Sequence, residues 1–183
     1  MPGDETPTSA PEPEFSRLVT ASKIPADGQT IDLIPDTDTL ALIAKRFAIP
    51  AIAAVKGTLT LVPTAHGVQI CGRFTAALTR ECVASLEPLA EHIDETVDVT
   101  FDRRVTDGDE DAIMDQLADG QDAEPLRGDD IDVGEFLVQQ LSLAMDPFPR
   151  KPGAPSLVER YGAAPEPSAF DALKALKPVN DDG

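Results

Sequence analysis

Four side chains of the kinds that bind zinc lie in the middle of the chain: His66, Cys71, Cys82 and His92. They are separated by four, ten and nine intervening residues, and no pair has the close C-x-x-C or H-x-x-x-H spacing of a zinc knuckle. Such a scattered set is more typical of structural side chains, with Cys71 on a strand face and Cys82 as a strand-end thiol. The spacing therefore predicts no metal site and no cofactor.

Signatures of catalysis are also missing from the sequence. A nucleophilic site needs a serine or cysteine beside a histidine and a third, orienting group, and the chain has two histidines and no G-x-S-x-G. The phosphate-binding patterns G-x-x-x-x-G-K-[ST] and G-x-G-x-x-G do not occur. No residue is assigned a catalytic role, no small-molecule substrate is indicated, and we expect a protein that is not an enzyme.

Acidic side chains gather at Asp130, Asp132 and Glu135, where an amphipathic segment begins. The partial positive charge at a helix start stabilises carboxylates, and Asp132 with Glu135 has the spacing of a capping box. We interpret the cluster as a helix cap. The alternative is a cryptic metal-dependent RNA hydrolase, whose RNA cleavage would be lost on Asp132→Asn.

Basic side chains occur in short clusters, which are Arg103-Arg104, Arg150-Lys151 and the pair Lys174 and Lys177. A local cationic strip on an acidic body can contact RNA, but no aromatic side chains that could stack on bases are interleaved with it. Lys174 and Lys177 also suit the C-terminal end of a helix. Contact with ribosomal RNA therefore remains an alternative.

The charge balance of the whole chain favours basic partners. The 183 residues include 33 acidic and 15 basic side chains, which gives a net charge of -18 at pH 7. Non-selective binding to phosphates needs an excess of lysine and arginine, whereas an acidic surface attracts cationic proteins. The alternative is a solvated acidic surface that has no partner.

Nothing in the sequence directs the chain to a membrane or out of the cell. The first residues are acidic and rich in proline, unlike a signal peptide. No apolar run approaches the ~18 residues that a membrane span needs. The two cysteines do not make a disulfide framework, so we expect a cytoplasmic protein with no membrane partner.

The composition changes along the chain predict one domain with tails. Residues 1–13, which carry four prolines and three acidic residues, are expected to form a disordered arm. A single domain is expected over 14–178, with a flexible acidic loop at 107–130. A short tail, 179–183, follows.

The pattern of apolar residues predicts an α+β fold. Alternation of apolar and polar residues predicts antiparallel strands with one buried face, and a spacing of three and four predicts helices. The expected strands are 14–19, 30–34, 55–61, 68–79 and 97–101, and the expected helices are 37–48, 133–145 and 167–177. The helices at 37–48 and 133–145 should cover the sheet, which could curl toward a barrel. Gly57 and Gly72 inside strands indicate bulges or close backbone contacts.

Three blocks of sequence occur in a recognisable order. Leu78–Leu89 reads L-T-R-E-C-V-A-S-L-E-P-L and is similar to a C-x-x-C-L-x-P corner between two strands. Ile131–Pro147 combines an acidic start, a helix and a proline-bearing end, and Pro167–Lys177 is similar to N-P-F-x-x-L-x-x-L-K. Together, over residues 14–177, these blocks resemble the YceD family, the large ribosomal RNA subunit accumulation proteins.

Two departures from the family pattern bear on chemistry. Ser85 stands where the family has its second corner cysteine, so Cys82 is alone. Many members also have cysteines after the second block, where this chain has residues 147–153 with the sequence P-F-P-R-K-P-G. A metal role in relatives is therefore not carried over to this chain.

The resemblance implies a bacterial cytoplasmic protein that supports normal levels of large-subunit ribosomal RNA and implies no known reaction. The net charge favours an indirect route, in which the chain binds a basic ribosomal protein or an rRNA-processing factor. The alternative is an acidic adaptor unrelated to ribosomes, held by the loop at 107–130. The expected contact residues are Arg80, Cys82, Glu87, Pro88, Arg103, Arg104, Arg150 and Lys151.

Overall fold

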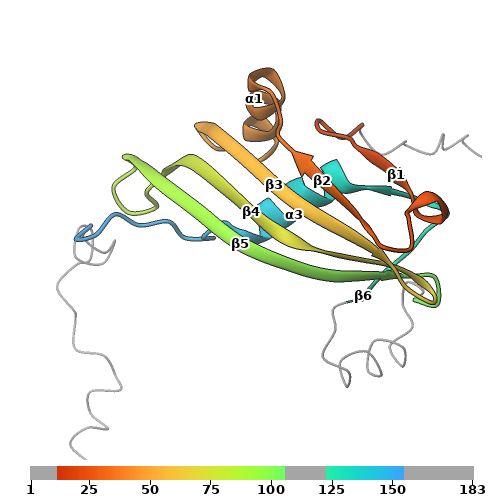
Figure 1. Ribbon diagram of the computed structural model, residues 1–183. Helices are drawn as coiled ribbons and strands as arrows, with labels where there is room; N and C mark the ends of the chain where they lie inside the picture. Colours follow the sequence, from red (N-terminus) through yellow and green to blue (C-terminus); the bar gives the residue numbers. More distant parts are fainter. Residues whose placement is uncertain (1–11, 106–122, 155–183) are drawn as a thin grey trace, which may run out of the picture.

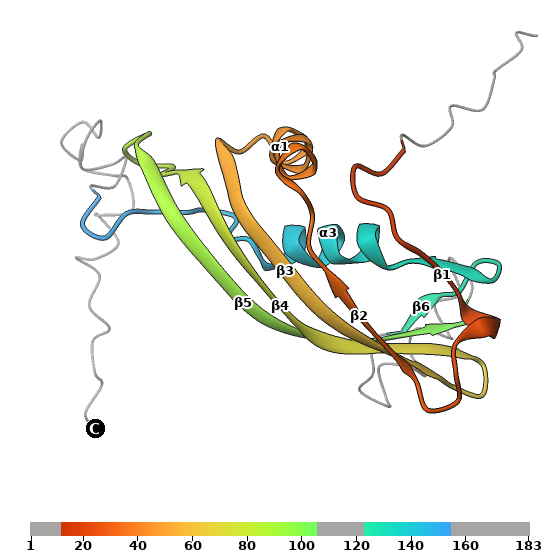
Figure 2. The same cartoon turned by 45° about the horizontal axis from the view of Figure 1, so that its top comes forward.

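A long, curved sheet with one helix in its hollow organises the chain (Figures 1 and 2). The computed structural model describes residues 12–105 and 123–154. Its main sheet has the strand order β2-β3-β4-β5-β6, and a separate pair joins β1 to β7. The strands are β1 (Leu18–Thr20), β2 (Gln29–Leu33), β3 (Ala51–Pro63), β4 (Gly67–Glu81), β5 (Pro88–Asp102), β6 (Ala123–Pro125) and β7 (Asp130–Asp132). The helices are η1 (Ala21–Lys23, a 3-10 turn), α1 (Thr37–Arg46) and α3 (Val133–Ala144).

The α+β class predicted from the sequence is confirmed, but the sheet remains open. Neighbouring strands from β2 to β5 are antiparallel, and β6 adds to β5 in parallel. The sheet therefore has two edges, β2 and β6, and does not close into a barrel. No helix among residues 12–105 and 123–154 is long and apolar enough to cross a membrane.

Alternation along the three long strands builds the floor of the core. The buried side chains of β3, β4 and β5 point to the same face, where they meet α3 and the buried residues of α1. This alternation is the period-two pattern of an antiparallel strand with one wet face. The side chains on this face include Val55, Leu59, Leu61, Val68, Ile70, Phe74, Leu78, Ile93, Val97 and Val99, all of them buried.

Helix α3 packs closely on the sheet because a glycine makes room for it. A methyl group on Gly57 would lie 3.0 Å from Cδ1 of Leu137, which is itself fully buried. The ring of Phe101 on β5 meets that of Phe136 edge to face, with their centres 5.7 Å apart. A methyl group on Gly72 would lie 2.2 Å from the backbone oxygen of Thr58. Both glycines thus mark close contacts, and the one irregularity between β3 and β4 lies instead between Ile52 and Ala54.

Helices α1 and α3 both begin at aspartate caps. The Asp36 carboxylate accepts a hydrogen bond from the Thr39 amide at 2.8 Å. Asp132 accepts from the amides of Gly134 and Glu135, so Asp132 is the cap of α3 as predicted. Glu135, however, forms a two-pronged ion pair with Arg46 of α1 and thereby joins the two helices.

Several predicted boundaries were wrong. The strand expected at 97–101 runs from Pro88 to Asp102. Proline is tolerated at the first position of a strand, so Pro88 does not interrupt it. The glutamates that point toward the core side of β5 conceal the alternation there. The strand expected at 14–19 is only Leu18–Thr20, and the loop expected at 107–130 contains β6 and reaches β7. The helix expected at 167–177, the tail at 179–183 and all but the last two residues of the arm expected at 1–13 lie outside the described residues.

Replacing Gly134 by alanine tests how the N-terminal segment packs on α3. Alanine favours a free helix by ~1 kcal/mol over glycine, but here its methyl group would lie 2.7 Å from the Phe15 oxygen and 2.8 Å from the Arg17 nitrogen. We expect Gly134→Ala to destabilise the fold by about 1–3 kcal/mol in urea unfolding. The exposed control Ser142→Ala should stabilise it slightly, by about 0.5 kcal/mol. A gain in stability for Gly134→Ala would contradict this packing.

Candidate functional site

The corner between β4 and β5 is a closed turn formed by residues 82–87. The Cys82 amide donates to the Glu87 oxygen at 2.9 Å, and the Leu86 amide donates to the Cys82 oxygen at 2.8 Å. Leu86 has a φ of 61°, a left-handed conformation that is strained for a bulky residue. Its side chain is 69% exposed. The turn therefore holds an apolar side chain in water at the cost of backbone strain, which is typical of functional positions.

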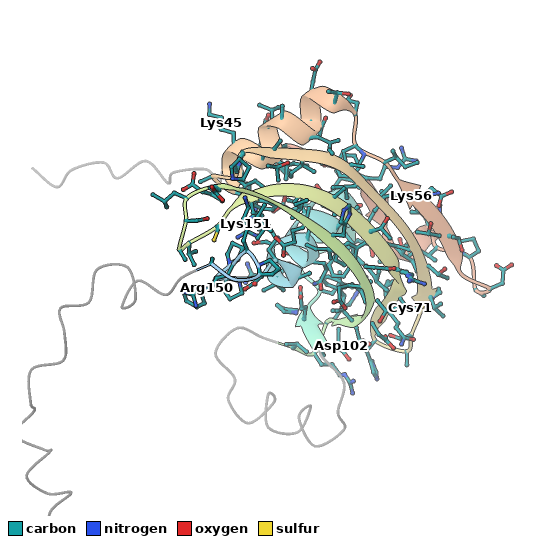
Figure 3. The ribbon with its side chains drawn as sticks, turned by 90° about the vertical axis from the view of Figure 1, so that its left-hand side faces the viewer. Lys45, Lys56, Cys71, Asp102, Arg150 and Lys151 are labelled. Carbon is teal, nitrogen blue, oxygen red and sulfur yellow. The ribbon has the colours of Figure 1, made fainter. Side chains whose placement is uncertain are left out.

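The segment after α3 lies directly against this corner. The Val83 amide donates to the Pro149 oxygen at 2.9 Å, and the Lys151 amide donates to the Cys82 sulfur at 3.4 Å. The Lys151 ammonium group pairs with Glu87 at 2.8 Å. We call residues 82–87 together with 146–151 the corner surface. Figure 3 shows Arg150 and Lys151 near this end of the sheet, whereas Asp102 marks the other end of β5.

A mostly buried ion pair fixes the point where α3 meets the corner surface. Arg80 of β4 pairs with Glu91 of β5 at 2.9 Å, and their side chains are only 12% and 15% exposed. Arg80 also donates to the Asp146 oxygen at 3.0 Å, while Glu91 accepts from the Asp146 amide at 2.9 Å. Arg80 thus satisfies the backbone at the end of α3, and its guanidinium group is engaged within the fold.

The Cys82 thiol is buried among hydrogen-bond donors. The Ser85 hydroxyl and the backbone amides of Lys151, Ser85 and Ala84 lower the pKa of this thiol to about 6, although burial alone would raise it. The Ser85 hydroxyl has the largest effect. The Ser85 oxygen is buried and has no other hydrogen-bond partner among the described residues.

The expected contact residues fall into two groups that the structure separates. Arg80, Cys82, Glu87, Pro88, Arg150 and Lys151 belong to or adjoin the corner surface, and Arg103 and Arg104 follow the opposite end of β5. Arg103 pairs with Asp129 at 2.6 Å, and Arg104 pairs with the buried Asp102 at 2.7 Å. The Arg104 guanidinium lowers the pKa of the Asp102 carboxyl group. Both arginines therefore hold loops to the sheet.

Two observations bear on the residues considered for zinc binding and for RNA hydrolysis. Among residues 12–105 and 123–154, no three His, Cys, Asp or Glu side chains form a group that could hold a metal ion. The Asp132 carboxylate accepts from the Ser16 hydroxyl and the Arg17 amide as well as from the start of α3. It ties the N-terminal segment to the helix.

Sequence reasoning did not find three exposed apolar residues of the corner surface, Val83, Leu86 and Phe148. Their side chains are 41%, 69% and 72% exposed. The available signal was the presence of large apolar residues in two loops that are otherwise polar or rich in proline. The contacts of Val83 with Pro149 and of Lys151 with Cys82 and Glu87 place the two loops side by side, and the sequence does not reveal them.

Removing the Arg80 side chain should be costly, because it leaves Glu91 charged and mostly buried. We expect Arg80→Ala to lower the free energy of unfolding by about 3 kcal/mol. Arg73 makes the equivalent cross-strand pair with Asp94, but these side chains are 66% and 49% exposed. Arg73→Ala should therefore change the free energy of unfolding far less than Arg80→Ala does in the same urea titration. Equal losses of unfolding free energy in the two variants would contradict the idea that burial makes the Arg80–Glu91 pair important for stability.

The lowered pKa of Cys82 predicts a pH-dependent contribution to stability. The folded thiol has a pKa of about 6, against 9.0 ordinarily, so its charged form is favoured in the fold. This stabilisation is complete above about pH 9 and is lost as the pH falls to about 6. The difference in unfolding free energy between the native protein and Cys82→Ala should therefore grow from pH 6 to pH 9. Urea unfolding across this range measures it, with Cys71→Ala as the control, and a constant difference would be inconsistent with the lowered pKa.

Comparison with known proteins assigns the family. A family model described as "Large ribosomal RNA subunit accumulation protein YceD" matches residues 70–177. No curated protein and no solved structure matches the chain. The matched range covers most of β4, all of β5 and α3, and the corner surface, which is more than half of the 183 residues. The chain therefore belongs to the YceD family of large ribosomal RNA subunit accumulation proteins.

Proposed function

We propose that this chain is a non-enzymatic cytoplasmic factor that supports the accumulation of large-subunit ribosomal RNA by binding a basic ribosomal protein or an rRNA-processing factor. The observation that carries the proposal is that two blocks of the family pattern converge at one place. The corner at 82–87 packs against the turn that follows α3, through Val83 and Lys151. The family membership supplies the process, and this surface supplies a place for a partner.

The distribution of charge favours a protein partner over RNA. Each of Arg80, Arg103, Arg104 and Lys151 is paired with a carboxylate of this chain. Arg150 is exposed and forms no ion pair with another described residue, and the whole chain has a net charge of -18. Of the five cations in the expected contact set, only Arg150 therefore remains unpaired among the described residues and able to displace counterions from a phosphate backbone. An acidic body attracts a basic protein over a distance, while the contact itself needs an anchor.

The exposed apolar side chains at the corner surface provide such an anchor. Leu86 and Phe148 are both mostly exposed, and they lie on two loops that the Val83–Pro149 contact brings together. Large apolar side chains at the centre of an interface, surrounded by charged residues, typically carry most of its binding energy. The Lys151–Glu87 pair borders this apolar area and is well placed to set the orientation of a partner.

Two alternatives make different demands on the same molecule. The hydrolase alternative needs the Asp132 carboxylate to be free for catalysis, and four donors already occupy it. The adaptor alternative depends on the loop at 107–130, most of which lies outside the described residues. Deleting residues 107–122 alone, which keeps β6 and β7, would abolish binding under the adaptor hypothesis and leave ribosomal RNA levels largely intact under our proposal.

Changing Leu86 and Phe148 tests the proposal without disturbing the fold. Asparagine tolerates the left-handed conformation of residue 86, so Leu86→Asn removes the apolar side chain while relieving strain. Combined with Phe148→Ser, it should lower the recovery of large-subunit proteins from a lysate by about tenfold or more. Large-subunit ribosomal RNA in cells carrying only this variant should fall in parallel.

The control is Leu42→Gln, which changes another leucine that is 51% exposed, on α1. It should leave both recovery and ribosomal RNA unchanged, and ribonuclease treatment should not reduce recovery by the native protein. Normal ribosomal RNA with the Leu86→Asn and Phe148→Ser variant, confirmed as folded, would refute the role of the corner surface. Loss of recovery after ribonuclease treatment would favour direct RNA contact instead.

A further inference from the structure

Most of one long edge of the main sheet has no neighbouring strand among residues 12–105 and 123–154. β5 is 15 residues long, and β6 pairs only with Thr100, Phe101 and Asp102 at one end of it. No described strand pairs with the other side of His92–Val99. Figures 1 and 2 show β5 as the outer strand, with β6 beside one end. In this stretch roughly every second residue directs its amide and carbonyl groups away from β4, so these groups are available to another strand.

Apart from its acidic side chains, this edge lacks the features by which proteins prevent strands from adding. The pairing of β5 with β4 runs from Pro88 to Asp102 without a bulge. The one proline is the first residue of the strand, and β5 contains no lysine or arginine. An edge without bulges, internal prolines or lysines is open to the addition of an extended segment.

The charges along the edge select the kind of segment. Asp94 and Asp98 lie on the outer face, and Glu95 lies on the face that carries the core. Asp94 pairs with Arg73, but the only described side chain that donates to Asp98 is the neutral Gln69 amide, at 2.7 Å. Glu95 is exposed and has no ion pair with a described residue. Negative charge therefore remains on both faces of the strand.

We propose that the His92–Val99 edge of β5 binds an extended, lysine- and arginine-rich segment of a partner protein by strand addition. An added strand places alternate side chains on the two faces of the sheet. Its cations would thus meet Asp98 on one face and Glu95 on the other, while its backbone completes the ladder. A second copy of β5 would instead bring like charges together, which disfavours self-association. The nature of the partner rests on the proposed function, and the strand addition itself can be tested without it.

A synthetic peptide of alternating lysine and threonine, about ten residues long, is a suitable probe for the full chain. At saturation, hydrogen exchange of the outward-facing amides in His92–Val99 should slow by about tenfold or more. The amides of β2, at the opposite edge, should not change. A peptide of the same sequence with N-methyl groups on the edge that meets β5 keeps every charge but cannot form the ladder. Equal binding of the two peptides, or protection outside β5, would overturn the proposal.

Charge-reversal variants separate the edge from the net charge. Glu95→Lys with Asp98→Lys should weaken peptide binding by about tenfold or more, because lysine at an edge opposes a cationic strand. The matched control, Glu12→Lys with Asp27→Lys, alters two other exposed acidic residues by the same total charge. It should weaken binding by no more than about twofold. Equal weakening by both pairs would show that the peptide senses only net charge and would overturn the proposal.

The outcome for strand addition is distinguishable from that for the proposed function. Peptide binding is measured on the purified chain and does not depend on ribosomal RNA. Ribosomal RNA levels in cells that carry Leu86→Asn and Phe148→Ser test the proposed function at the corner surface. Failure of the peptide to protect β5 therefore removes the edge site alone, and normal ribosomal RNA in those cells removes the function alone.

Discussion

The packing of α3 into the hollow of the curved sheet is the contact on which the rest of the structure depends. Leu137 and Phe136 fill the space over Gly57 and Phe101, and without this helix the apolar face of β3, β4 and β5 would lie in water. Both ends of the helix are tied down. Asp132 joins its start to the N-terminal segment, and the Arg80–Glu91 pair holds the backbone of Asp146 just beyond its end. Because a helix of 12 residues has a fixed length of about 18 Å, this packing delivers the following turn to the corner.

Much of the fold could be predicted from the sequence because the relevant forces are local. The alternation in Val55–Leu61 and the aspartate before each helix depend on neighbours along the chain. The early start of β5 could not be read in this way, since Glu91 and Glu95 lie on the same face as Ile93 and Val97. That error affected the predicted site. Because β5 is 15 residues long, Arg103 and Arg104 lie a whole strand away from the corner, and a shorter strand would have left them closer to it.

The composition of the candidate site could be predicted in part, but its chemistry could not. The sequence blocks identified the corner and the Arg150–Lys151 turn as regions of interest, and the structure brings them together. The environment of Cys82 depends on the amide of Lys151, which is 69 residues away in the sequence. Likewise, whether an arginine is free or paired depends on which carboxylate the fold places beside it. Most cations of the predicted contact set turn out to be engaged within the molecule.

This internal pairing changes how an acidic member of the family can be expected to recognise its partner. The cations hold loops and strand ends in place, and the surface that remains is apolar at the corner and acidic along β5. Such a surface suits a basic protein that has an apolar patch and an extended tail. The two features are consecutive along the chain: the corner ends just before Pro88, the first residue of β5, and the open edge is part of β5 itself.

The central claim is that the corner surface meets a basic protein of the ribosome or its processing machinery inside the cell. The most direct measurement places a photo-reactive amino acid at Phe148 and, as a comparison, at Leu42, and identifies the cross-linked species by mass spectrometry. Our account predicts an adduct with a basic large-subunit ribosomal protein or an rRNA-processing factor at residue 148 and none at residue 42. Adducts only with RNA at residue 148, or the same adducts at both positions, would contradict it.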